Sequence, residues 1–132
     1  MNQTATVTGA TTRPVEMAVD FLTSAAAGHA REAWQRYGNP VFRHHNPSFA
    51  GDGVTLVEAM DRDAAEHPNK VLEIQRVISE GPLVAIHSAL RRTDMPDAAT
   101  VHIFRIEDGT ILEFWDIGQD VPAETPNQYG MF

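Results

Sequence analysis

The residues best placed to do chemistry are ionisable side chains set among apolar neighbours. Asp116 follows Phe114 and Trp115, and His102 precedes Ile103 in another run of β-branched and aromatic residues. Burying a carboxylate is costly unless it is paired or protonated, so chains tolerate it mostly where a shifted pKa is useful. A carboxylate and imidazoles in an apolar cavity suit proton transfer to and from a carbon acid or a hydroxyl.

Three more histidines extend this set. His87 lies within an apolar run over residues 83–90, where a histidine is also often a satisfied core residue. His44 and His45 precede Asn46 in the densest polar cluster of the chain, which could also be a strand end in water. The predicted pocket therefore holds Asp116, His87, His102, one of His44 and His45, and Asn46, surrounded by Trp34, Phe42, Phe104 and Phe114.

Composition narrows the function classes. The chain has 132 residues, no cysteine, and 10 basic against 18 acidic residues, a net charge of −8 without a basic cluster. These values predict a single domain without thiol chemistry and argue against a nucleic-acid partner. No apolar run approaches the ~20 residues that span a bilayer, so no membrane partner and a cytoplasmic location are expected. No nucleotide-binding, phosphate-binding or nucleophile-elbow motif is present, so no cofactor is expected.

The order of periodic segments predicts the fold class. Residues 1–13 form a polar arm and residues 14–132 one domain with a docked apolar tail over 120–132. Helical spacing covers 14–27, 30–37 and 54–66, and strand runs cover 71–79, 83–92, 99–106 and 110–119. Short turns between successive strands imply an antiparallel meander, and the whole is an α+β arrangement with three N-terminal helices on one face of a curved sheet.

The turn around Glu107, Asp108 and Gly109 decides which side chains share a face. A two-residue turn at Asp108 and Gly109 would place His102 and Asp116 on opposite faces. A three-residue loop with Gly109 at positive φ would place them together, along with Leu112. We favour the loop because it gathers both polar groups on one apolar face.

The other face of this sheet is also apolar. Val101, Ile103, Trp115 and Ile117 would lie on it. Since a large apolar face is rarely left in water, a homodimer built on this outer face is expected.

The chain resembles the SnoaL-like branch of the nuclear transport factor 2-like superfamily, often described as aldol-condensation catalysts. The resemblance covers residues 14–132 and rests on the element order, on His45-Asn46-Pro47, on His87 after an apolar run, and on Trp115-Asp116 in the last strand. It implies a cystatin-like α+β roll, a cone with an internal pocket that is usually homodimeric. It also implies cofactor-free closure of polyketide rings. Asp116 then matches the acid/base, and His45, Asn46 and His87 match polar residues that line the cavity.

The chain departs from this pattern at three positions. Phe42 replaces a common phenol, His44 a frequent glutamine, and His102 a frequent aspartate. These changes bear on the substrate more than on the fold.

Three functional hypotheses follow. The first is a cofactor-independent enzyme acting on a small, mostly apolar carbonyl compound. In it Asp116 moves the proton, His87 polarises the carbonyl, and Asn46 with His45 orients the ligand. The second is a non-catalytic protein that binds a small hydrophobic ligand. The third is a metal site built from His44 or His45 with His87, His102 and Asp116. Desolvation predicts that the pKa of Asp116 is raised and that Asp116→Asn leaves the fold unharmed.

Overall fold

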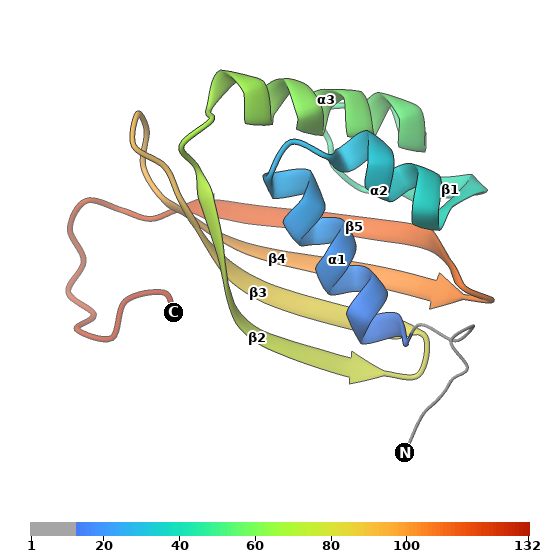
Figure 1. Ribbon diagram of the computed structural model, residues 1–132. Coiled ribbons are helices and arrows are strands. Elements are labelled where there is room, and N and C mark those ends of the chain that lie inside the picture. Colours follow the sequence, from blue (N-terminus) through green and yellow to red (C-terminus); the bar gives the residue numbers. More distant parts are fainter. Residues whose placement is uncertain (1–12) are drawn as a thin grey trace, which may run out of the picture.

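A computed structural model describes residues 13–132, and the arm predicted over residues 1–13 lies outside it except for Arg13. The elements are α1 (Pro14–Ala26), α2 (Ala30–Tyr37), β1 (Gly38–His44), α3 (Gly53–Glu66), β2 (Val71–Glu80), β3 (Leu83–Arg91), β4 (Ala98–Glu107) and β5 (Thr110–Asp120). Figure 1 shows the three helices on one side of the curved sheet, which confirms the predicted α+β class. Among the described residues, no helix is long and apolar enough to cross a membrane.

Local sequence signals set the ends of the helices. Pro14 occupies the first turn of α1, where a missing N–H costs nothing. Gly28 follows α1 with a φ of 94°, a left-handed conformation that glycine adopts readily. The Asp52 carboxylate caps α3 by accepting hydrogen bonds from the Thr55 backbone N–H at 2.9 Å and hydroxyl at 2.7 Å.

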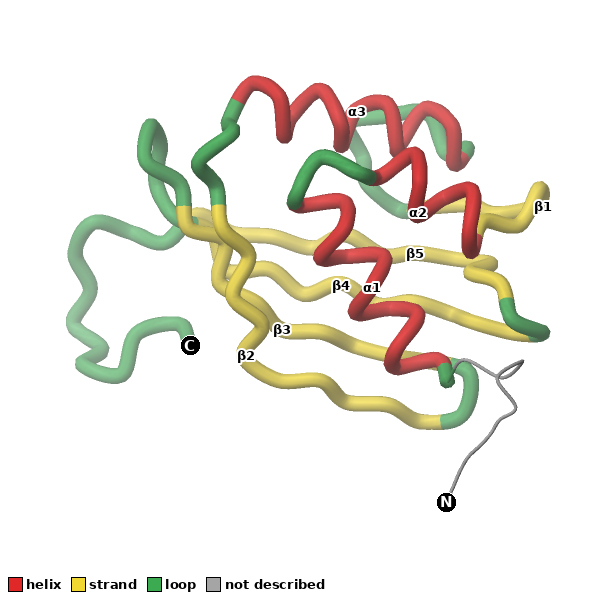
Figure 2. The backbone as a smooth tube through the Cα atoms, in the orientation of Figure 1, coloured by secondary structure: helices red, strands yellow, loops and turns green. Residues whose placement is uncertain are grey.

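The sheet has five strands in the order β1-β5-β4-β3-β2. The last four form the predicted antiparallel meander, visible as the continuous curved layer in Figure 2. The sheet also has a fifth strand outside this meander. β1 pairs in parallel with β5 at the sheet edge. After β1 the chain forms α3 on the helical side of the sheet, and the meander begins only after α3.

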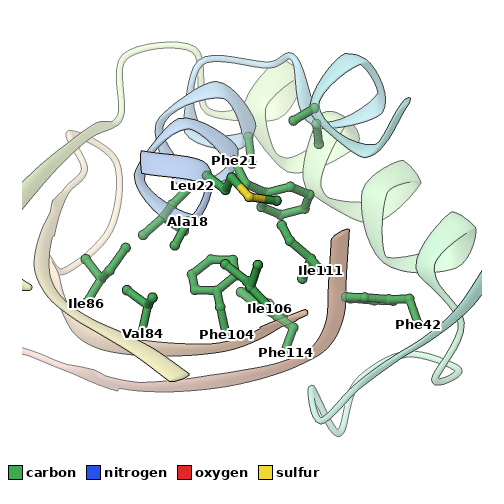
Figure 3. Close-up of a cluster of buried hydrophobic side chains, with 14 of the residues drawn as sticks. Ala18, Phe21, Leu22, Phe42, Val84, Ile86, Phe104, Ile106, Ile111 and Phe114 are labelled. Carbon is green, nitrogen blue, oxygen red and sulfur yellow. The ribbon is translucent and has the colours of Figure 1, made fainter. Parts of the chain in front are cut away.

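The core fills the space between α1 and the middle of the sheet. The Phe21 ring lies 5.9 Å from that of Phe104 and 6.2 Å from that of Phe114, and all three are buried. Figure 3 shows Phe21 and Leu22 of α1 above the aromatic residues of β4 and β5. Burying such side chains stabilises a fold by ~1.5–3 kcal/mol each.

The β4–β5 hairpin corrects the predicted turn. Glu107 pairs with Thr110, and both Asp108 (φ 52°) and Gly109 (φ 75°) are left-handed, so the loop has two residues rather than three. The positive φ of Gly109 is confirmed. The two-residue turn alone would separate His102 from Asp116.

A β-bulge after the turn changes the register. Arg105 pairs with Glu113 while Ile106 pairs with Ile111, which leaves Leu112 as the extra residue. From there on, His102 pairs with Asp116, so the prediction that they share the helix-covered face is confirmed. Leu112 was expected on that face, but the bulge puts Ile111 in the core instead.

The last residue of the C-terminal tail contacts the outer face of the sheet. The Phe132 ring stacks on His87 at 5.9 Å, and the guanidinium of Arg91 lies 5.1 Å from the same ring. The tail therefore covers part of β3 on the side away from the helices.

Candidate active site

A cavity of about 270 Å³ lies between the helices and the sheet. Its walls are mostly apolar, with a few polar groups. The lining residues are Leu22, Ala25, Ala26, Asn46, Phe49, Leu56, Ala59, Met60, Asp63, Lys70, Leu72, Leu90, Thr100, His102 and Asp116. A mostly apolar hollow with a few convergent polar groups is the usual form of a small-molecule site.

Asp116 is the centre of the polar groups. Its Oδ1 lies 3.1 Å from Nε2 of His102 on the neighbouring strand. Its Oδ2 accepts a hydrogen bond of 2.7 Å from the side-chain amide of Asn46, which is 70 residues away in sequence. Both carboxylate oxygens are thus held by donors from different elements.

The His102 ring is fixed by its surroundings. It stacks on Phe114 with ring centroids 5.4 Å apart, and its residue is only 8% exposed. Nδ1 is buried without a partner among the described residues. Nε2, which faces Asp116, therefore carries the hydrogen that is donated to the carboxylate.

Asn46 is held in turn by the loop that follows β1. Its Oδ1 accepts from the Ser48 backbone N–H at 2.9 Å, which points the NH₂ group to Asp116. Its backbone N–H donates to Nδ1 of His44 at 3.1 Å, and Nε2 of His44 lies 2.6 Å from the Ala50 carbonyl oxygen. His44 is therefore a buried support behind the site rather than a group in the cavity wall.

The predicted rise in the pKa of Asp116 is wrong. Burial by itself raises the pKa, but the hydrogen bond and positive charge of His102, the Asn46 amide and the more distant His44 outweigh it. The pKa therefore lies below its ordinary value of 3.8, and Asp116 is a carboxylate at neutral pH. The apolar neighbours of Asp116 in the sequence indicated that it is desolvated. They did not indicate that His102 and Asn46 donate hydrogen bonds to it in the folded chain.

Two of the predicted catalytic histidines do not reach the cavity. Inward-facing Ile86 and Ser88 flank His87, whose ring lies on the outer face against Arg76 and Phe132. His45 also faces outward, where its Nε2 lies 2.6 Å from Glu113 and its ring stacks on Trp115. The roles predicted for these two residues in the pocket are therefore wrong.

The predicted aromatic lining is also corrected. Phe104 and Phe114 belong to the core beneath the cavity. Trp34 packs edge-on against Phe42, with ring centroids 5.0 Å apart, at the end of the core near β1. The cavity wall is made instead mainly of aliphatic side chains and Phe49.

The alternative metal site is wrong for the same reason. Its ligands are divided between the two faces of the sheet, with His45 and His87 outside and His102 and Asp116 inside. Both ring nitrogens of His44, the alternative to His45, are taken up by the Asn46 backbone N–H and the Ala50 carbonyl oxygen. Within residues 13–132, no three His, Cys, Asp or Glu side chains converge as a metal site would require.

Sequence reasoning missed two features of the cavity. The Thr100 hydroxyl lines it one inward position before His102, donating to the Ser88 carbonyl oxygen at 3.4 Å. Asp63 lines it from the last turns of α3, and Lys70 from the position just before β2. One signal was available, because Lys70 is the only lysine in the sequence.

Comparison with solved structures identifies the architecture. The structure matches an NTF2-like protein from Cytophaga hutchinsonii with a TM-score of 0.67 at 12% identity, over 84% of this chain and 94% of that one. The chain has the nuclear transport factor 2-like fold. The resemblance to the SnoaL-like branch is thus confirmed at the level of the fold.

Two further matches are provisionally assigned as cyclases. A SnoaL-like polyketide cyclase from Jannaschia matches with a TM-score of 0.70 at 17% identity, over 80% of this chain and 85% of that one. IdmH, a polyketide cyclase from Streptomyces antibioticus, matches with a TM-score of 0.68 at 18% identity, over 82% and 93% of the two chains.

No family model matches the sequence, and no curated protein does. AclR from Streptomyces galilaeus, provisionally assigned as a hydroxylase, matches with a TM-score of 0.63 at 18% identity, over 81% and 91% of the two chains. Because the fold carries differently assigned proteins, the function must be argued from the site itself.

Proposed function

We propose that this protein is a cofactor-independent acid/base enzyme that moves a proton on a small, mostly apolar carbonyl compound, as in an aldol-type cyclisation or an isomerisation. The observation that carries the proposal is the Asp116 carboxylate, held by His102 and Asn46 in an apolar cavity. The names of the fold neighbours support the same class of reaction.

In the proposed reaction Asp116 takes a proton from the carbon next to the ligand carbonyl. Its lowered pKa keeps it ionised and ready as a base, and displacement of water by an apolar ligand strengthens that base by further desolvation. The electron pair of the broken C–H bond moves onto the carbonyl oxygen. In an isomerisation the proton then returns from Asp116 to a different carbon of the conjugated system. In an aldol-type cyclisation the enolate carbon instead attacks a second carbonyl of the same molecule, and the alkoxide so formed takes the proton from Asp116. Neither route needs an external reactant.

The developing enolate oxygen needs a donor. Asn46 has a second amide hydrogen beyond the one given to Asp116, whereas the single hydrogen of the Thr100 hydroxyl is already donated to the Ser88 carbonyl oxygen. We assign to the Asn46 amide the polarising role that the sequence had given to His87. His102 acts as a positioning residue that holds the carboxylate through Nε2.

The test uses benzoylacetone, a small apolar 1,3-diketone. The protein should accelerate the conversion of its enol to its ketone, followed by ultraviolet absorbance. Asp116→Asn should reduce the protein-dependent rate by at least about 10²-fold, the usual contribution of a placed acid or base. Asp108→Asn, which removes a carboxylate from the exposed turn, should keep the protein-dependent rate. Wild-type protein that binds the diketone without accelerating the conversion would overturn the proposal.

That outcome would favour a second candidate, a protein that binds a small hydrophobic ligand without turnover. The lowered pKa of Asp116 and the hydrogen bonds to both of its oxygens favour it, since they are also the properties of a structural ion pair. Under this hypothesis Asp116→Asn changes only the affinity for the diketone, measured by calorimetry.

We also propose that the protein is a homodimer that works in the cytoplasm, as expected from its apolar outer face and from its sequence.

A further inference from the structure

Lys70 combines three unusual properties. It is the only lysine of the 132-residue chain, its side chain is 9% exposed, and it lines the cavity. No other lining residue is a Lys or Arg. Charged side chains are almost never this buried unless they are paired, so the position of the ammonium calls for a physical reason.

Lys70 has a counter-ion but keeps donors to spare. Its Nζ contacts the Asp63 carboxylate, which is half exposed and also lies 3.9 Å from Nε2 of His67. Among the described residues, Asp63 is the only one that accepts a hydrogen bond from Nζ of Lys70. Since an ammonium carries three N–H donors, two remain for another acceptor.

The strand register places Lys70 far from the acid/base pair. Leu72 pairs with Leu90 and Leu90 with Ala98, whereas His102 lies four residues further along β4, about 13 Å away at the rise of a strand. Lys70 precedes Leu72, and β2 is separated from β5 by two strands. The ammonium and Asp116 are therefore at opposite corners of one cavity.

The cavity thus has two polar ends and an apolar middle. Met60, Leu72 and Leu90 contribute apolar wall to it. Asp116 is a carboxylate at neutral pH and repels an anion, whereas Lys70 has N–H donors beyond its contact with Asp63 with which to bind one. A ligand with an anionic end is therefore favoured with that end at Lys70.

We propose that Lys70 binds an anionic group of the ligand, and that the substrate class is therefore an apolar carbonyl compound carrying a carboxylate at the end remote from its reactive carbon. This inference rests on the proposed function for the reactive end. It adds the charge of the ligand and its orientation in the cavity.

The test compares two ligands of nearly equal shape, 4-acetoacetylbenzoate and 4-acetoacetylbenzamide. Calorimetry should show that the wild-type protein binds the carboxylate about tenfold more tightly, the effect of one hydrogen bond to a charged group. Lys70→Met keeps the apolar stem and should lose this preference, while Lys70→Arg should retain it. Arg62→Met makes the same change of net charge at an exposed position of α3 and should bind like wild type.

The outcomes separate this inference from the proposed function. Equal affinity of the wild-type protein for both ligands would overturn the role of Lys70, even if the protein converts their enols. Tighter binding of the carboxylate without conversion would support anion binding by Lys70 and would overturn the proposed catalysis by Asp116. Borohydride reduction of the complex that adds the ligand mass to Lys70 would also overturn it, because the amine would then be a nucleophile rather than an anion receptor.

Discussion

At the scale of single residues, the pKa of Asp116 shows that hydrogen bonds from two donors, with the charge of nearby histidines, can lower a pKa by more than burial raises it. A carboxylate with a lower pKa in the folded than in the unfolded state stabilises the fold above its unfolded pKa, and that contribution is lost as the pH falls through the folded pKa. For Asp116 the loss begins below 3.8 and continues towards its lowered folded pKa.

We expect Asp116→Asn to destabilise the protein at pH 7 by about 1–3 kcal/mol, as for a lost hydrogen bond to a charged group. The new amide has one acceptor for two donors, and Asn46 cannot turn because Ser48 holds its oxygen. Thermal unfolding of both proteins between pH 7 and pH 2 should show the difference shrinking below pH 3.8. An Asn variant at least as stable as wild type at neutral pH would contradict this expectation.

Gly109 is a second residue whose backbone decides the outcome. Its φ of 75° strains any residue with a Cβ, and we expect Gly109→Ala to cost about 1–2 kcal/mol in unfolding free energy. Gly118→Ala is the matched control, since its new Cβ would meet the Thr100 methyl group at an ordinary 3.6 Å. Equal losses in urea denaturation of the two variants would argue against a two-residue turn in which Asp108 and Gly109 are left-handed.

At the scale of elements, one carboxylate joins three segments on the outer face. Glu113 of β5 accepts from Arg43 of β1 at 3.0 Å and from Arg105 of β4 at 3.2 Å. It also lies 2.6 Å from Nε2 of His45 in the loop after β1. These partners lower the pKa of Glu113 from 4.5 to about 2. The network fastens the parallel edge strand to the meander.

We expect this network to make stability depend on pH in acid. The contribution of Glu113 is present above pH 4.5 and is lost as the pH falls towards about 2, because its pKa is lowered by folding. Glu113→Gln should cost about 1–2 kcal/mol at pH 7, limited by the exposure of Arg43. It should also flatten the decline of the melting temperature between pH 4.5 and pH 2.

Glu107→Gln is the control, because that carboxylate is exposed and contacts only Arg105 among these partners. It should leave the acid decline largely unchanged. A Glu113 variant with the same pH profile as wild type would show that the network does not stabilise the edge strand.

At the scale of the whole molecule, the outer sheet face retains exposed apolar surface beside the docked tail. Val101, Ile103 and Trp115 are half-buried there, and Ile117 is 55% exposed. A stable interface needs about 800 Å² from each partner, which calls for most of the β4–β5 face. The tail occupies β3 instead, so this region is left for a second copy.

We expect a homodimer in sedimentation at micromolar concentration, converted to a monomer by Trp115→Glu, since a buried charge without a partner disfavours association. Val41→Glu should remain dimeric, because Val41 is exposed on the edge strand and away from the proposed contact. A monomeric wild-type protein, or a Trp115→Glu variant that stays dimeric, would contradict the interface.

The sequence by itself determined the elements and the inward positions of His102 and Asp116. Helical spacing, Pro14 and the change to strand alternation are local signals, and they predict the segments to within a few residues. The shared face was predicted for the wrong reason. A two-residue turn and a bulge at Leu112 together give the same alternation as the expected loop.

The tertiary structure alone decided which polar groups meet. Apolar residues on both faces of β3 concealed that His87 points outward, and only the loop after β1 brings Asn46 to Asp116 across 70 residues. The pKa of Asp116 and the place of Lys70 depend on such long-range contacts. Local periodicity sets the face on which a side chain lies, but its partners depend on strand register and chain crossing, which packing of the whole domain fixes.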